Sequence, residues 1–410
     1  MNMSRSLLAG TTVALLPSSM TPTAFKAYAE RADIARRRGV QLLYCEPTEE
    51  NLRRIHAGDP LRFRYWNGKS MDEREEPAPK GWYDRSPLRG RQRDFYNSFW
   101  SSISARGALF VNERDFRYTI ADKWNAYQFF DEHKFTTPKT SLFAPDALHD
   151  MLQTYGTVRI KRRRASQGKG QYVVLKNSGQ GVNIQPDTAL TPIAFGTLGK
   201  ALDWLLKQGV DDQFLVQEKI SSDTIAGHAY DIRAVFQRNE HGRLGMTGAY
   251  IRVAYPRSRQ ANIHKSGHPH AITLSLNDEG LERDIKDEGA AIAEALTESR
   301  KFGRFGEIGL DFLYDEDRYQ LIAIELNSLP GGKGFRELAS WQPTDERNRQ
   351  RKVLPILYDN ETHLIWEKRL QRFLINPVLY AAHLATSDAT RRSESETAEH
   401  HPPARAKRET

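Results

Sequence analysis

The chain has 410 residues, 39% of them hydrophobic and 27% charged, which is enough to form two or three packed lobes of a globular protein. Its single cysteine, Cys45, excludes a disulfide within the chain and a zinc site built from several cysteines. The net charge of +8 and the pI of about 9.3 suit an anionic ligand, but the basic residues lie in short runs, so nucleic acid is not favoured as a partner.

The N-terminal apolar stretch Leu7–Leu16 follows Arg5 and loosely resembles a signal peptide. Gly10, Thr11 and Thr12 interrupt it and no small-residue cleavage site follows, so a first β-strand is the preferred interpretation. No apolar run approaches the roughly 20 residues that a membrane span needs. We therefore expect a cytoplasmic protein without a membrane span.

Residues 1–115 predict a small α/β domain. Strands are expected at Val13–Leu16 and Val40–Tyr44, and the helical spacing over Phe25–Arg38 between them indicates a βαβ unit. Phe95–Ala105 is a further predicted helix.

Residues 116–340 predict an α+β domain in which antiparallel hairpins dominate the second half. Its helices are expected at Asp122–Glu132, Leu198–Gln208 and Asp284–Ser299. Its strands are expected at Thr157–Ile160, Gln171–Leu175, Phe214–Glu218, Ile232–Gln237, Gly248–Val253, Gly309–Tyr314 and Leu321–Leu326.

The C-terminal part divides into polar helices over residues 341–385 and a tail over residues 386–410. The tail is rich in Ser, Thr, Glu, His, Pro and Arg. This composition buries too little apolar surface to offset chain entropy, so we expect disorder.

A basic segment, residues 159–170, enters a Gly-rich turn. Strand alternation puts Arg159, Lys161 and Arg163 on one face, and the glycines of the turn allow backbone N–H groups to converge on phosphate oxygens. The turn contains Ser166, Gln167, Gly168 and Gly170. It lacks the Walker A pattern, and alone it leaves a solvated basic hairpin or a contact with RNA open as alternatives to a phosphate site.

A second motif combines two strands that carry acidic residues. In the strand ending Ile324-Glu325-Leu326-Asn327, the side chains of Glu325 and Asn327 share a face. A hairpin with the strand containing Asp311 would bring Asp311 opposite Glu325. Two carboxylates and an amide oxygen suit Mg²⁺, with Mn²⁺ as an alternative, although a merely polar strand face has the same pattern.

Together with the strand Phe214–Glu218 and the strand carrying Asp231 and Arg233, these segments resemble the ATP-grasp superfamily over residues 112–335. The resemblance implies an ATP-grasp fold, in which two α+β subdomains clasp ATP, preceded by a small α/β domain. Trp82–Ser86, Thr137–Thr140 and Thr247–Val253 further resemble the spore-coat-associated branch.

The resemblance implies roles for individual residues. Lys123 and Lys161 would bind phosphates with the Gly-rich turn, and Arg233 and Arg252 would act in catalysis. Asp311, Glu325 and Asn327 would hold magnesium. The remaining residues implied to contact ATP or its neighbourhood are Gln217, Glu218, Lys219, Ile220, Asp231 and Asn262.

The resemblance implies an ADP-forming ligase that joins a small carboxylate to an amine or peptide through an acyl phosphate. Two alternatives remain: a surface-associated ATP-binding protein without turnover, and a kinase of a small acid. The chain departs from many relatives after Asn262, where Ile263-His264 replaces a Gly-Gly turn. His264, His268 and His270 are interpreted as a solvated loop or substrate contact rather than a zinc site, because no acid lies nearby.

Overall fold

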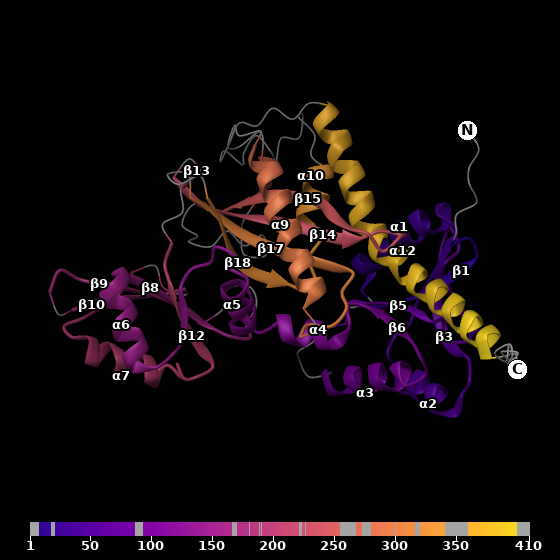
Figure 1. Ribbon diagram of the computed structural model, residues 1–410, viewed down its shortest axis with the longest axis horizontal. Helices are drawn as coiled ribbons and strands as arrows, with labels where there is room; N and C mark the ends of the chain where they lie inside the picture. The colour runs from indigo at the N-terminus through magenta and orange to yellow at the C-terminus, as the bar shows by residue number, and fades with distance from the viewer. Residues whose placement is uncertain are drawn as a thin grey trace, which may run out of the picture. The chain divides into compact units, whose positions relative to one another are not determined.

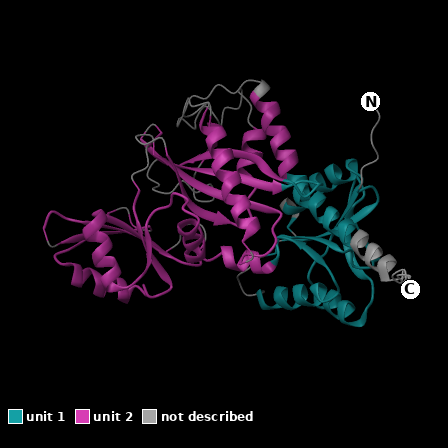
Figure 2. Ribbon diagram, viewed as in Figure 1, with its two compact units in different colours: residues 1–113, 238–243, 374–410 teal, residues 114–237, 244–373 magenta. Residues whose placement is uncertain are grey.

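The computed structural model describes residues 8–17, 21–86, 93–165, 170–179, 181–187, 189, 191–220, 224–225, 227–254, 268–272, 280–299, 301–315, 320–340 and 360–399. The chain divides into two compact units (Figure 2). The first comprises Met1–Glu113, Arg238–Arg243 and Leu374–Thr410; the second comprises Arg114–Gln237 and Leu244–Phe373. The first stretch ends close to residue 115, where the sequence predicts a boundary, but the two later stretches of the first unit were not expected.

The first unit is built on a six-stranded sheet with the order β4-β3-β2-β1-β5-β6. Strand β1 precedes helix α1 in the sequence and β2 follows it. The two strands pair in parallel, so the predicted βαβ unit is present. Its strands are β1 (Thr11–Leu16), β2 (Val40–Tyr44), β3 (Leu61–Trp66), β4 (Met71–Glu76), β5 (Gly81–Asp84) and β6 (Leu109–Val111). Its helices are α1 (Pro22–Arg37), α2 (Glu49–Ala57) and α3 (Arg93–Ser104).

The C-terminal helix α12 (Asn360–Glu399) contributes its second half to the first unit. A Cβ atom on Gly81 would lie only 2.3 Å from the carbonyl oxygen of Ala381, so glycine allows this helix to contact the start of β5. The helix continues past residue 386, where the sequence predicts that disorder begins, and residues 400–410 lie outside the described residues.

Pro377 lies inside α12 and cannot donate a hydrogen bond to the carbonyl oxygen of Phe373 one turn earlier. The side-chain nitrogen of Gln237 donates to that oxygen at 3.1 Å. A proline is therefore tolerated here because a side chain satisfies the group that it leaves open.

The second unit contains two sheets. The first, here called the β8–β12 sheet, is antiparallel with the order β11-β10-β9-β8-β12-β7. Helices α6 (Pro145–Tyr155) and α7 (Leu198–Lys207) cover one of its faces (Figure 1) and bury the side chains of Ile160, Val174 and Val216. Its strands are β7 (Thr140–Leu142), β8 (Thr157–Arg162), β9 (Gln171–Lys176), β10 (Val182–Pro186), β11 (Ile193–Phe195) and β12 (Phe214–Glu218).

The other sheet, the β14–β18 sheet, has the order β16-β15-β14-β17-β18, with β13 (Thr224–Ile225) pairing β14. Helix α9 (Leu281–Glu298) packs against it and shares its core with α4 (Arg114–Ile120) and α5 (Lys123–Glu132). Its strands are β14 (His228–Arg238), β15 (Leu244–Val253), β16 (His268–His270), β17 (Glu307–Asp315) and β18 (Gln320–Asn327). Helix α10 (Lys333–Ala339) follows β18.

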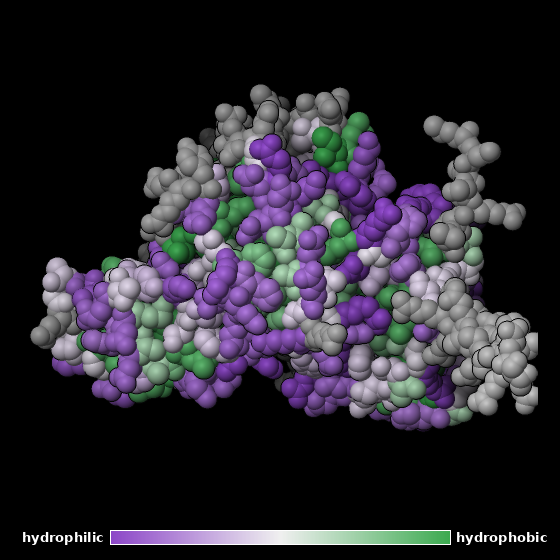
Figure 3. Space-filling model, in the orientation of Figure 1, coloured by the Kyte–Doolittle hydropathy of each residue, from purple (hydrophilic) through white to green (hydrophobic). Residues whose placement is uncertain are grey.

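In the part of the chain that the structure describes, no helix is long and apolar enough to cross a membrane. On the face drawn in Figure 3, hydrophobic residues form small patches between hydrophilic ones.

Candidate functional site

The hairpin β17–β18 places the predicted metal ligands on neighbouring strands. Asp311 pairs with Glu325 and Gly309 pairs with Asn327, so the expected register of the hairpin is observed. A Cβ on Gly309 would lie 3.4 Å from that of Asn327, which shows how closely the backbone approaches this side chain. The amide oxygen of Asn327 accepts a hydrogen bond from the Leu329 N–H at 3.2 Å.

Two arginines on strands β14 and β15 hold Asp311. Arg233 on β14 contacts both carboxylate oxygens, one of them from Nη2 at 2.7 Å, and Arg252 on β15 reaches Asp311 at 3.0 Å. Burial alone would raise the pKa of Asp311, but these guanidinium groups outweigh it and hold the pKa below its usual range. In this structure the carboxylate of Asp311 is therefore occupied by two cations.

Arg252 binds Asp231 through its Nε atom, while its Nη2 atom contacts Asp311. Burial raises the pKa of Asp231 to about 6, although Arg252 opposes the change. In the structure, the carboxylate of Asp231 has Arg252 as its partner. The role of Asp231 at the nucleotide stays a prediction.

Helix α5 begins with Lys123, whose amine reaches Glu325 on β18. Asp122 caps this helix by accepting from the Trp124 N–H at 3.0 Å, and it also binds Arg163 at 2.8 Å and Arg164 at 3.2 Å. Arginines of the predicted basic segment thus serve to fix α5 to the end of β8.

The amine of Lys123 donates to the carbonyl oxygen of Ala165 at 2.7 Å and to Glu325 at 2.8 Å. These contacts connect the end of β8 with β18. Lys123, Asp311 and Glu325 are therefore brought together, as the sequence analysis expects.

Lys161 lies on the face of β8 opposite the α6–α7 core, because its neighbour Ile160 belongs to that core. Its side chain is 7% exposed. Burial, together with the nearby Lys123, lowers the pKa of Lys161 to about 7 in spite of the attraction of Glu325.

Arg159 shares this face two residues earlier on β8. Its side chain is half-buried, and burial lowers its pKa against the attraction of Asp231. Strand alternation predicts that Arg159 lies beside Lys161, but a run of basic residues alone does not indicate a separate role for it.

The predicted adenine-binding segment follows β12. The side chain of Gln217 donates to Thr140 Oγ1 at 2.8 Å, and a carboxylate oxygen of Glu218 accepts from the Lys139 N–H at 3.2 Å. The Lys219 N–H donates to the Thr157 carbonyl at 3.3 Å. Ile220 follows directly, so this segment is fixed to β7 and β8 by hydrogen bonds.

Part of the predicted site lies outside the described residues: Ser166, Gln167, Gly168, Asn262 and His264. Gly170 is described and has a φ of +67°, which favours glycine. His268 and His270 lie on β16, and burial lowers the pKa of His270 to about 4. Among the described residues, no three His, Cys, Asp or Glu side chains are grouped so that they could hold a metal.

The charges of the site fit an anion. Asp231, Asp311 and Glu325 each contact a cation. No carboxylate of the described residues lies within ion-pair distance of Arg159 or Lys161. A buried cation without a counter-ion is costly, and a phosphate would supply the missing charge. The oxygens of Asp311, Glu325 and Asn327 have the chemistry that magnesium prefers. To bind it, Glu325 must release Lys123, and Asp311 must release Arg233 and Arg252.

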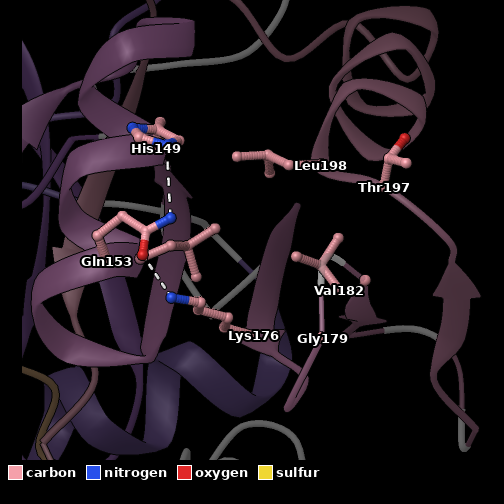
Figure 4. Close-up of a pocket in the computed structure, with 9 residues that line it drawn as sticks. His149, Gln153, Lys176, Gly179, Val182, Thr197 and Leu198 are labelled. Atoms are coloured by element: carbon pink, nitrogen blue, oxygen red, sulfur yellow. Dashed lines mark hydrogen bonds between the residues drawn. The ribbon is translucent and has the colours of Figure 1, made fainter.

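A separate pocket of about 430 Å³ lies between α6, the β9–β10 hairpin and the start of α7 (Figure 4). Gln153 contacts both His149 and Lys176 at its edge. None of the residues predicted to act in nucleotide binding or catalysis is among those that line it, so it is not the candidate site.

Solved structures with similar folds share little sequence with this chain. N5-carboxyaminoimidazole ribonucleotide synthetase in complex with ADP is 11% identical, with a TM-score of 0.51 over 86% of this chain and 80% of that one. D-alanine–D-alanine ligase from Bacillus anthracis is 10% identical, with a TM-score of 0.48 over 94% and 100%. A search of curated protein sequences finds no significant match.

The family comparison is more specific. The model of the family described as YheC/D like ATP-grasp matches residues 112–358, more than half of the chain. This range includes both sheets of the second unit and every residue of the candidate site. The chain therefore belongs to the YheC/D-like family, the spore-coat-associated branch of the ATP-grasp superfamily.

Proposed function

We propose that the protein is an ADP-forming ligase that uses ATP and Mg²⁺ to activate a small carboxylate and join it to an amine or peptide. The observation that carries this proposal is the convergence of two kinds of group in the second unit. Lys161, which has no ion-pair partner among the described residues, lies near Lys123 and Glu325. Lys123 donates to Glu325, and Glu325 pairs with Asp311 on the neighbouring strand.

In the proposed reaction, a carboxylate oxygen of the substrate attacks the γ-phosphorus, the bond to the β–γ bridging oxygen breaks, and ADP leaves. The amine nitrogen then attacks the acyl carbon, the bond to the phosphate oxygen breaks, and the nitrogen loses a proton to solvent. No covalent bond to the protein is needed, so the protein acts by positioning and by neutralising charge.

The residues have distinct roles in this proposal. Lys123 and Lys161 bind phosphate oxygens, and Arg233 stabilises the charge that develops on the transferred phosphoryl group. Arg252, oriented by Asp231, binds the acyl phosphate. Magnesium, held by the oxygens of Asp311, Glu325 and Asn327, would neutralise charge on the phosphates.

The direct test is ADP release by the purified full chain with ATP, Mg²⁺ and a pool of amino acids and peptides. The proposal expects ADP and phosphate, with turnover that requires both an acid and an amine. AMP with pyrophosphate as the main products would contradict the acyl phosphate. Turnover that needs only an acid would indicate a kinase, and ATP binding without any turnover would indicate a binding protein.

A further inference from the structure

The face of β8 that carries Lys161 also carries a second basic residue, Arg159. Arg159 lies two residues away, roughly 6.6 Å along the strand, on the same face and half-buried. The intervening Ile160 and the preceding Val158 belong to the core on the other face. The strand therefore holds Arg159 on the same face as Lys161.

The register of the sheet places Arg159 nearer than Lys161 to the predicted adenine-binding segment. Arg159 pairs with Gln217, the residue just before Glu218, whereas Lys161 pairs with Leu215. Lys161 is instead close to Lys123 and Glu325, which affect its pKa. A nucleotide that runs from the end of β12 to these groups must pass Arg159 before it reaches Lys161.

Arg159 also lacks an ion-pair partner among the described residues. The nearest carboxylate that influences it is Asp231, which is bound to Arg252. A half-buried guanidinium without a counter-ion loses part of its hydration, and a bound anion would compensate that loss. Its planar donors match the geometry of phosphate oxygens.

We propose that Arg159 binds the phosphate nearest to the nucleoside, the α-phosphate, and so is a nucleotide-binding residue additional to Lys123 and Lys161. This proposal rests on the proposed function, because it requires a nucleotide between β8 and β17–β18. On the face of β8 opposite the α6–α7 core, Arg159 would then contact the α-phosphate and Lys161 the outer phosphates.

The matched control is Arg162, the neighbouring arginine that points to the other face of β8. Its guanidinium lies over the ring of Phe214 at 4.9 Å from the ring centre, and its residue is exposed. Arg159→Met and Arg162→Met therefore remove the same charge from the same strand, on opposite faces.

The experiment is calorimetric titration of the full-length wild type, Arg159→Met, Arg159→Lys and Arg162→Met with ATP, ADP, AMP and adenosine. Arg159→Met is expected to weaken binding of ATP, ADP and AMP by about 10- to 100-fold and to leave adenosine binding unchanged. Arg159→Lys should fall between it and the wild type, and Arg162→Met should bind like the wild type.

Thermal unfolding without nucleotide separates this role from a structural one. Because Arg159→Met removes a half-buried charge that has no ion-pair partner among the described residues, its Tm should equal or exceed that of the wild type. A lower Tm together with weaker adenosine binding would overturn the proposal, as would equal nucleotide affinities of Arg159→Met and Arg162→Met. A loss confined to ATP would place Arg159 at the γ-phosphate and contradict the assignment. If the wild type binds no nucleotide, the proposed function fails instead.

Discussion

At the scale of single residues, Lys161 links nucleotide binding to pH. Burial lowers its pKa in the folded chain to about 7 from an ordinary value of 10.5, so near pH 8 the amine is mainly neutral when no nucleotide is bound. Phosphate oxygens favour the charged amine, and binding should therefore take up on the order of one proton at this pH.

This proton uptake can be measured by calorimetry of ATP binding at pH 8 in buffers of different ionisation enthalpy. The observed enthalpy should vary with the buffer for the wild type, and the variation should disappear in Lys161→Met. ATP affinity of the wild type should fall as pH rises from 7 to 9. A wild-type enthalpy that is independent of the buffer would contradict the role of Lys161.

The same shift makes a prediction about stability. Because the folded pKa is lower than the unfolded one, the unfolded chain binds more protons between pH 7 and about 10. The contribution of Lys161 to the free energy of unfolding therefore rises with pH in this window, and its unfavourable effect is greatest below pH 7. Lys161→Met should gain stability relative to the wild type at pH 6 more than at pH 9, as measured by urea unfolding.

The two predicted carboxylate ligands should respond differently to mutation. The side chain of Glu325 is 36% exposed and that of Asp311 is 4% exposed. Glu325→Gln breaks a partly exposed ion pair, which costs about 0–1 kcal/mol. Asp311→Asn leaves Arg233 and Arg252 without this counter-ion and should cost roughly 3–5 kcal/mol.

Melting temperature and ADP release across a magnesium titration test this contrast. Glu325→Gln should fold normally but lose most turnover, whereas Asp311→Asn should lose both stability and turnover. Normal turnover and normal magnesium dependence in Glu325→Gln would mean that this strand face is only a polar surface.

At the scale of elements, strands β14, β15, β17 and β18 form a site whose carboxylates are neutralised before any metal arrives. Glu325 is bound by Lys123, and Asp311 by two arginines. A divalent cation alone would have to displace these cations against charge repulsion. A triphosphate attracts the same cations, so nucleotide should expose the carboxylates to metal.

We therefore predict that Mn²⁺, measured by electron paramagnetic resonance, binds at least about tenfold more tightly in the presence of a non-hydrolysable ATP analogue. Lys123→Met is the informative variant, because it frees Glu325 while removing a phosphate ligand. It should bind Mn²⁺ more tightly than the wild type without nucleotide and bind nucleotide more weakly. Equal Mn²⁺ affinity of the wild type with and without nucleotide would contradict this mechanism.

The elements also show which parts of the site the sequence predicts. Short apolar strands, such as Val40–Tyr44 and Phe214–Glu218, have the predicted bounds. The pairing of Asp311 with Glu325 follows from the charged turn of one hairpin. Partners chosen from distant strands do not follow from local pattern: Lys123 and Glu325 are 202 residues apart. Short or edge strands, such as β7 and β16, carry too few residues to show a period.

At the scale of the whole molecule, the C-terminal helix was the largest difference from expectation. The composition after residue 340 predicts polar helices followed by a disordered tail from residue 386. In the first unit, the part of α12 from Leu374 onward contributes these buried side chains: Val378, Leu379, Tyr380, Ala381 and Ala382. The helix is therefore part of the core of that unit rather than an appendage.

Two truncations distinguish a core helix from a dispensable tail. A chain that ends at Asp388 retains these buried residues and the ion pair between Lys80 and Asp388 at 3.2 Å, so its Tm should stay within a few degrees of the wild type. A chain that ends at Ile375 loses Val378 and Leu379, each worth about 1.5–3 kcal/mol when fully buried.

The shorter chain should therefore show a much lower Tm or fail to accumulate in soluble form, and circular dichroism with calorimetry would measure the difference. The space that Gly81 leaves for the Ala381 carbonyl provides a control within the full chain. Gly81→Ala adds one methyl group at that contact and should lower the Tm, because the backbone of α12 must move away from β5. If Gly81→Ala and both truncations match the wild type, α12 does not pack on the first unit.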